Sequence, residues 1–115
     1  MYYGNSSGKI YGQVDNDGTI YDDCHREKGK FDSDGTVRDD CNREIGKFDS
    51  DGAYRDDCSR EKGFVDSDGT VRDDCYRIIG KIDDDGTVYD DCHREIGNAS
   101  GISKEKAAYL YFFSK

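Results

Sequence analysis

Residues 80–96 read Gly-Lys-Ile-Asp-Asp-Asp-Gly-Thr-Val-Tyr-Asp-Asp-Cys-His-Arg-Glu-Ile. This 17-residue unit occurs five times in succession from Gly12 to Ile96, without an insertion or a deletion. Strict self-similarity at a fixed period is the signature of a repeat architecture, in which neighbouring units share one core. The period is marked most clearly by the cysteines, which are Cys24, Cys41, Cys58, Cys75 and Cys92.

The repeat extends beyond both ends of this run. Tyr2-Tyr3 align with the Thr-Val of later units, and Gly97-Asn98-Ala99 begins a sixth unit. A chain that begins and ends within a unit suits a ring whose first and last strands pair, because such a ring has no free edge. We therefore predict one repeat domain over residues 1–101, with half repeats at both ends. The full repeats are residues 12–28, 29–45, 46–62, 63–79 and 80–96.

Each unit contains two turn signals, and this predicts a β-hairpin. Asp-Gly pairs such as Asp34-Gly35 are typical of hairpin turns, because glycine accepts a positive φ without steric cost. The second turn lies at Asp-Cys-x-Arg, where x is mostly Gly, His or Asn, residues enriched at left-handed φ. Tyr76 at this position fits the pattern least. The strands beside the Asp-Gly turns carry the predicted core residues Val37, Val71 and Val88, with Phe31, Phe48 and Ile82.

The fold class that follows is all-β. One hairpin with about four apolar residues is not stable alone, so many must pack side by side. We predict six short hairpins between residues 2 and 99, arranged as a closed or nearly closed radial flower or barrel-like array.

The C-terminal segment differs from the repeats in composition. Residues 102–114 contain good helix formers, no glycine and an apolar second half, and Ser103 is a plausible N-cap. We predict one C-terminal α-helix, within a segment of residues 102–115, that covers an open apolar face of the ring. The alternative is an exposed helix that binds a partner or a membrane surface.

The overall composition excludes several classes. The 115 residues are 33% hydrophobic and 37% charged, with a net charge of −9 and a mean hydropathy of −1.02. No apolar stretch reaches the ~20 residues that cross a membrane, and no basic patch favours nucleic acid. No secretory signal is visible at the N-terminus, so we expect a cytoplasmic protein with reduced cysteines.

The repeat resembles a known family. Residues 80–90, Gly-Lys-Ile-Asp-Asp-Asp-Gly-Thr-Val-Tyr-Asp, and residues 44–52, Glu-Ile-Gly-Lys-Phe-Asp-Ser-Asp-Gly, are similar to the repeats of bacterial β-flower proteins. The resemblance spans nearly the whole chain and implies hairpins gathered about an axis in four- or five-fold fashion. Choline-binding repeats share the spacing but use tryptophan, which is absent here. The family has a polar residue where this chain has cysteine, and the resemblance implies no catalytic residue.

The aspartates raise the question of a divalent cation site. In the EF-hand frame set by Gly35, position 1 is Lys30 and position 12 is Cys41, which excludes an EF-hand. The aspartates act either as turn formers or, as an alternative, as cation ligands. The candidates are Asp32, Asp34, Asp39, Asp40 and their repeat equivalents.

The five cysteines have three interpretations. We expect small, partly buried hydrophobic residues beside the turn, kept reduced. The alternatives are disulfides between chains or repeats, and a soft-metal site of several thiolates joined by His25 and His93. An odd number of cysteines cannot pair completely within one chain.

Arginine recurs at two positions. The first set follows Asp-Asp-Cys-x, so we expect a turn-closing salt bridge with a carboxylate three residues upstream; the alternative is an arginine ring that binds an anion. This set is Arg26, Arg43, Arg60, Arg77 and Arg94. The second set lies beside the inward valine and is our candidate contact surface, since planar side chains are favoured at interfaces. It comprises Tyr21, Arg38, Arg55, Arg72 and Tyr89.

No catalytic frame is found. The chain has no Ser-His-Asp arrangement and no phosphate-binding glycine motif, and every carboxylate pair recurs in each unit. We therefore expect no enzymatic activity and no cofactor. The sequence favours a structural or protein-interaction module with a protein partner or a second copy. The alternative function is a module that binds a divalent cation or an anion.

Overall fold

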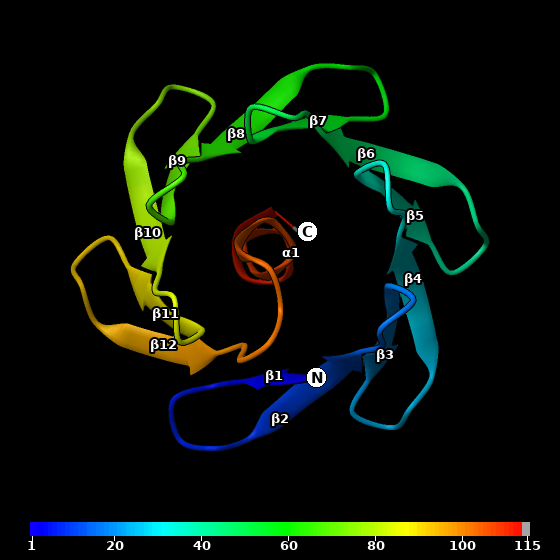
Figure 1. The fold of residues 1–115 in the computed structure, drawn as a ribbon, viewed down its shortest axis with the longest axis horizontal. Coiled ribbons are helices and arrows are strands. Elements are labelled where there is room, and N and C mark those ends of the chain that lie inside the picture. The colour runs from blue at the N-terminus through cyan, green and yellow to red at the C-terminus, as the bar shows by residue number, and fades with distance from the viewer. Residues whose placement is uncertain (114–115) are drawn as a thin grey trace.

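The repeated hairpins join edge to edge into a closed ring of twelve antiparallel strands (Figure 1). The computed structural model describes residues 1–113. Strands that are consecutive in sequence pair with each other, and β1 pairs with β12 through Gly4 and Asn98, which confirms the predicted closure. The strands are β1 (Tyr2–Gly4), β2 (Ile10–Val14), β3 (Thr19–Asp22), β4 (Glu27–Phe31), β5 (Thr36–Asp39), β6 (Glu44–Phe48), β7 (Ala53–Asp56), β8 (Glu61–Val65), β9 (Thr70–Asp73), β10 (Ile78–Ile82), β11 (Thr87–Asp90) and β12 (Glu95–Asn98).

Two kinds of turn alternate around the ring. Because neighbouring strands run antiparallel, successive turns lie at opposite ends of the strands. The aspartate-glycine turns form one end, which we call the acidic rim: residues 15–18, 32–35, 49–52, 66–69 and 83–86. The other turns splay outward as loops, which we call the petal tips (Figure 1): residues 5–8, 22–25, 39–42, 56–59, 73–76 and 90–93. The two strands joined by a tip form a petal.

The two kinds of turn share the same backbone hydrogen bond and end in a residue with a positive φ. In the rim turn, Asp32 N–H donates to Thr36 O at 2.7 Å, and Gly35 closes the turn with a φ of 94°. In the tip, Asp39 N–H donates to Arg43 O at 2.9 Å, and Asn42 has a φ of 68°. A left-handed residue at the end of a tight turn matches the right-handed twist of the strands. The predicted left-handed φ is found at His25, Asn42, Ser59, Tyr76 and His93.

The core lies inside the ring. Val14, Val37, Val71 and Val88 are fully buried, and Ile82 is only 1% exposed. Such positions alternate with outward residues along each strand, as the two-residue period of a strand requires. The six valine, phenylalanine and isoleucine residues predicted for the core are all buried.

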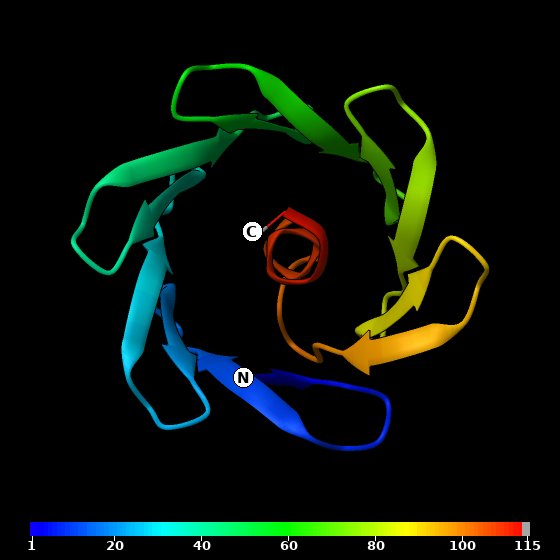
Figure 2. The same cartoon turned by 180° about the vertical axis from the view of Figure 1, so that it is seen from behind.

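The C-terminal segment runs through the middle of the ring (Figures 1 and 2). Helix α1 (Lys104–Ala108) begins at the acidic rim, where Ser103 accepts a hydrogen bond from Lys106 N–H as the predicted N-cap. It continues as the π-helical turn η1 (Tyr109–Phe113). The predicted helix therefore fills the ring instead of covering one face of it. Residues 114–115, which the prediction included, lie outside the described residues.

Glycines in β8, β10 and β12 make room for this segment. A Cβ atom at Gly63 would collide with the Phe113 ring, and one at Gly80 would collide with the Phe112 ring. Glycine inside a strand commonly marks such a close approach. The Tyr111 hydroxyl lies between the carbonyl oxygens of Gly4 and Asn98, so it also holds the closing strands together.

Two isoleucines on β10 provide a test of the inward core. Replacing Ile82 with alanine leaves a cavity at a fully buried site, and we expect the free energy of unfolding to fall by about 2–5 kcal/mol. Ile78→Ala is the matched control, because Ile78 is 52% exposed and we expect a change below about 0.5 kcal/mol. Urea unfolding of both variants measures the difference, and equal losses would contradict this inward core.

Candidate functional site

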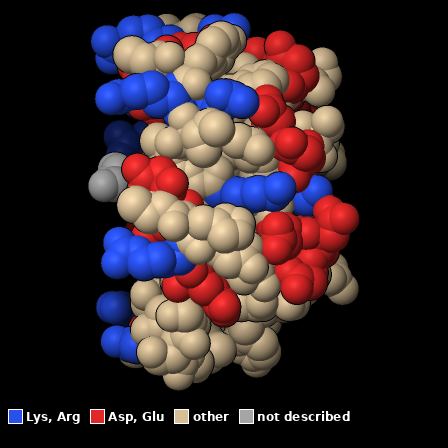
Figure 3. All heavy atoms as spheres, turned by 90° about the vertical axis from the view of Figure 1, so that its left-hand side faces the viewer, with Lys and Arg blue, Asp and Glu red and all other residues tan. Residues whose placement is uncertain are grey.

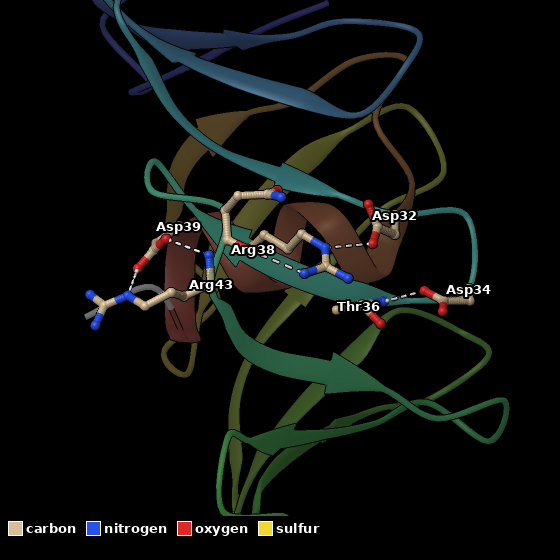
Figure 4. A network of polar contacts seen from close by, with 7 residues as sticks. Asp32, Asp34, Thr36, Arg38, Asp39 and Arg43 are labelled. Carbon is tan, nitrogen blue, oxygen red and sulfur yellow. Dashed lines mark hydrogen bonds and ion pairs between the residues drawn. The ribbon is translucent and has the colours of Figure 1, made fainter.

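The predicted contact stripe lies on the outer face of the ring, where its arginines connect the acidic rim to the petal tips. Arg38 Nε donates to Asp32 Oδ2 at 2.8 Å, and its Nη1 donates to the carbonyl oxygen of Asn42 at 3.3 Å (Figure 4). The same two bonds recur at Arg55 and Arg72. Each guanidinium is half-buried and is fixed at two points, so it is held rigidly for display.

The two tyrosines of the stripe are held by a different contact. Tyr21 stacks on His25 with ring centroids 4.4 Å apart, and Tyr89 stacks on His93 at 4.5 Å. Partial desolvation, and then the nearby Asp15 carboxylate, raise the pKa of Tyr21. In the stripe, tyrosine thus occurs in units whose tip residue is histidine, and the two rings stack. Arginine bonds the backbone carbonyl group of the tip residue, so it does not depend on the side chain at the tip. The stripe is therefore both an exposed surface and part of the framework.

In the five cysteine-bearing petal tips, the first aspartate organises the turn. Asp39 Oδ1 accepts hydrogen bonds from Cys41 N–H and Arg43 N–H, both at 2.9 Å, and Oδ2 accepts one from Arg43 Nε at 3.1 Å (Figure 4). The bond from the Arg43 backbone is the main reason why the pKa of Asp39 is lowered. The predicted partner three residues upstream is wrong, because Arg43 pairs with the aspartate four residues upstream.

The arginines of the tips are spread around the perimeter of the ring. Each tip guanidinium belongs to a separate petal and is about 80% exposed. Exposed ion pairs of this kind contribute little to stability, typically about 0–1 kcal/mol. The predicted arginine ring therefore consists of isolated pairs at the perimeter.

The cysteines are exposed at the tips. All five are free and solvent-exposed, so the prediction of partly buried hydrophobic residues is wrong. The reason is geometric: each cysteine is the third residue of a turn that splays away from the ring, where no neighbouring strand covers it. No disulfide joins them among residues 1–113.

The side chains that could hold a metal ion lie together within single tips. Ligand atoms of Asp39, Asp40 and Cys41 lie within 4.8 Å of one another, and the other four cysteine-bearing tips repeat this group. The group contains no histidine, which separates it from the predicted soft-metal set with His25 and His93. Both oxygens of Asp39 already bind the turn, which leaves Asp40 and Cys41 as the less committed donors.

The structure divides the predicted calcium ligands into two places. Asp32 and Asp34 lie at the acidic rim, whereas Asp39 and Asp40 lie at the tip, at the opposite end of β5. Asp34 Oδ1 accepts the Thr36 N–H at 3.0 Å, as a turn-forming aspartate does. On the edge of the ring drawn in Figure 3, most Asp and Glu lie toward one side and most Lys and Arg toward the other.

A groove that was not predicted from the sequence lies where β1 meets β12. It has a volume of about 420 Å³ and is lined by Met1, Tyr2, Ile10, Asn98 and Ser100, among others. We call it the seam groove. A signal was present: Gly4 occupies the position of Tyr21 and Arg38 in the following units, so the stripe lacks a side chain here.

The family can be assigned once this geometry is known. A family model described as 5-fold beta-flower protein matches residues 3–115. The chain belongs to this family. Comparison with curated proteins gives no match, and comparison with solved structures gives none either. Within residues 1–113 this beta-flower protein has six petals, five of which have the Asp-Asp-Cys tip. No helix of the beta-flower protein within residues 1–113 is long and apolar enough to cross a membrane.

The tip aspartates predict a specific acid sensitivity. The pKa of Asp39 is lower in the folded chain, so its contribution is present above the ordinary value of about 3.9 and is lost as the pH falls through the lowered value. Asp39→Asn keeps the acceptor oxygen but removes this titration. Between about pH 5 and pH 2, we expect the free energy of unfolding to fall less in this variant than in the wild type.

The control for this experiment is Asp40→Asn, one residue along the same tip. Asp40 forms no hydrogen bond or ion pair with residues 1–113, and we expect its acid profile to follow the wild type. Urea unfolding at each pH gives the profiles. Identical profiles for Asp39→Asn and the wild type would show that the tip carboxylate does not couple folding to pH.

The exposed tips also predict thiol reactivity. All five thiols should react with a disulfide reagent in the native protein, as completely as they do in denaturant. The released chromophore counts them directly. A native count below the denatured count would mean that tips are covered, bonded or metal-bound, and repeating the titration with a chelator separates the last case.

Proposed function

We propose that this beta-flower protein is a non-catalytic protein-interaction module whose contact surface is the outer stripe. The observation that carries this proposal is that a constant framework displays varied residues at equivalent positions. Between β4 and β5 the outer face carries Lys30 with Arg38, whereas between β8 and β9 it carries Phe64 with Arg72. Varied side chains on an invariant scaffold are typical of repeat proteins that bind partners.

The same observation supports the absence of catalysis. The first aspartate of every cysteine-bearing tip accepts the same backbone hydrogen bond, so no one tip is distinguished from the others as the site of an acid or a base. The proposal includes a cytoplasmic location, because five exposed thiols stay reduced there.

Two matched triple variants test the contact surface. Arg38→Gln, Arg55→Gln and Arg72→Gln together change the stripe, while Arg43→Gln, Arg60→Gln and Arg77→Gln make the same chemical change at the tips. We expect a protein captured from a lysate of the producing cells by the wild type and by the tip variant. We expect at least a tenfold lower recovery of that protein by the stripe variant, as planar arginines anchor interfaces.

Circular dichroism and the midpoint of thermal unfolding confirm that both variants are folded. Equal recovery on the wild type, the stripe variant and the tip variant would contradict the proposed surface.

A further inference from the structure

The exposed large apolar side chains among residues 1–113 gather on two of the six petals. Tyr76 and Ile78, which are 59% and 52% exposed, belong to the petal of β9 and β10. The others belong to the petal of β1 and β2 and are Met1, Tyr2, Ile10 and Tyr11. In a chain of near-identical units, such confinement marks two particular surfaces, because a general requirement of the fold would affect every petal.

The first surface is the seam groove. Gly4 and Gly8 stand where the next petal has the stacked pair of Tyr21 and His25. The groove is therefore the space that a flat aromatic ring and its partner occupy in the neighbouring unit. Ile10 replaces the glutamate of most other units and makes one wall apolar.

The second surface protrudes, and we call it the Tyr76 patch: Phe64, Tyr76 and Ile78. The preceding unit has Lys47, Ser59 and Glu61 at these positions, so three polar side chains are replaced by apolar ones. The rings of Phe64 and Tyr76 have their centroids 6.0 Å apart, and both line one pocket with Arg72. Ile78 pairs with Arg72 across the β9–β10 ladder and extends the patch.

Charge determines which partner fits. The whole protein has a net charge of −9, so copies repel unless the contact avoids acidic side chains. Residues 1–14 contain no acidic residue, whereas every other tip has Asp-Asp. Lys9 lines the seam groove. The exposed Asp74 lies two residues before Tyr76 and has the cationic Arg72 and Arg77 near it, so docking of these two surfaces brings no two acidic side chains together.

We propose that the Tyr76 patch of one copy docks into the seam groove of a second copy, with the Tyr76 ring in the space left by Gly4 and Gly8. This inference rests on the proposed interaction role and names one partner for it. Because groove and patch are different surfaces, the contact is head-to-tail, and each dimer keeps one of each available for further copies. A contact between this three-residue patch and one groove is smaller than a standard interface, so we expect micromolar affinity.

Residues borrowed from other petals give variants that should fold. The patch variant is Tyr76→Ser with Ile78→Glu, which copies Ser59 and Glu61. The groove variant is Gly8→His with Ile10→Glu, which copies His25 and Glu27; His25 has the positive φ that Gly8 has. The control, Asn42→Ser with Glu44→Gln, changes the same positions on the petal of β5 and β6.

Sedimentation velocity over a range of concentrations is the measurement. We expect the mass of the wild type and of the control to rise above the 13.0 kDa monomer with concentration. Each variant alone should remain monomeric, with at least a tenfold weaker self-association. An equimolar mixture of the two variants should form a 1:1 dimer, because one supplies an intact groove and the other an intact patch.

A wild type that stays monomeric throughout, variants that still associate alone, or a mixture that forms no dimer would each overturn the head-to-tail contact. If a double variant loses its fold by circular dichroism, Ile78→Glu and Ile10→Glu alone make the same test. The patch variant can also serve as bait in the capture experiment. If the patch variant still captures the partner protein, the proposed interaction role holds even where self-association is lost.

Discussion

Three of the strands that follow a petal tip, β8, β10 and β12, have a glycine where the ring meets the central segment. The missing side chains let Tyr111, Phe112 and Phe113 pack directly against the strand backbone. An isolated helix as short as α1 and η1 is not stable in water, and a ring without it would enclose a hollow. The two parts therefore depend on each other. This mutual burial explains how a chain that is only 33% hydrophobic forms a core: the space to be filled is a narrow cylinder.

The high charge of the chain is largely a property of its turns. Asp34 and Asp39 bond backbone N–H groups that the turns would otherwise leave without partners, and Arg38 joins the two ends of β5 across the outer face. Hydrogen bonds to a charged carboxylate are stronger than those between neutral groups. Acidic residues that suggest ligands in the sequence thus act as structural elements, and the distinctive chemistry lies where one unit departs from the others, as at Gly4 and Tyr76.

The sequence predicted the features that depend on local geometry. The hairpins, the left-handed tip residues and the Ser103 cap follow from residue types at fixed spacing, and ring closure follows from the partial units at the two ends. The features that were missed depend on distances across the ring. Cysteine is usually buried, but the outward angle of the tips exposes it, and this angle is not encoded in a 17-residue period. Mid-strand glycines such as Gly63 and Gly80 were a signal of the position of the central segment. They could not be interpreted from the sequence, because the rings for which they leave room belong to distant residues, Phe113 and Phe112.

The central segment has an evolutionary consequence. In open solenoids, tandem duplication can add a unit while the others keep their contacts, because each unit touches only its neighbours. Here an added unit would widen the ring, and the rings of Phe112 and Phe113 would no longer reach the strands on every side. A change in unit number therefore requires a simultaneous change in the C-terminal residues. Gain or loss of a repeat by recombination is thus constrained by a segment that lies outside the repeats.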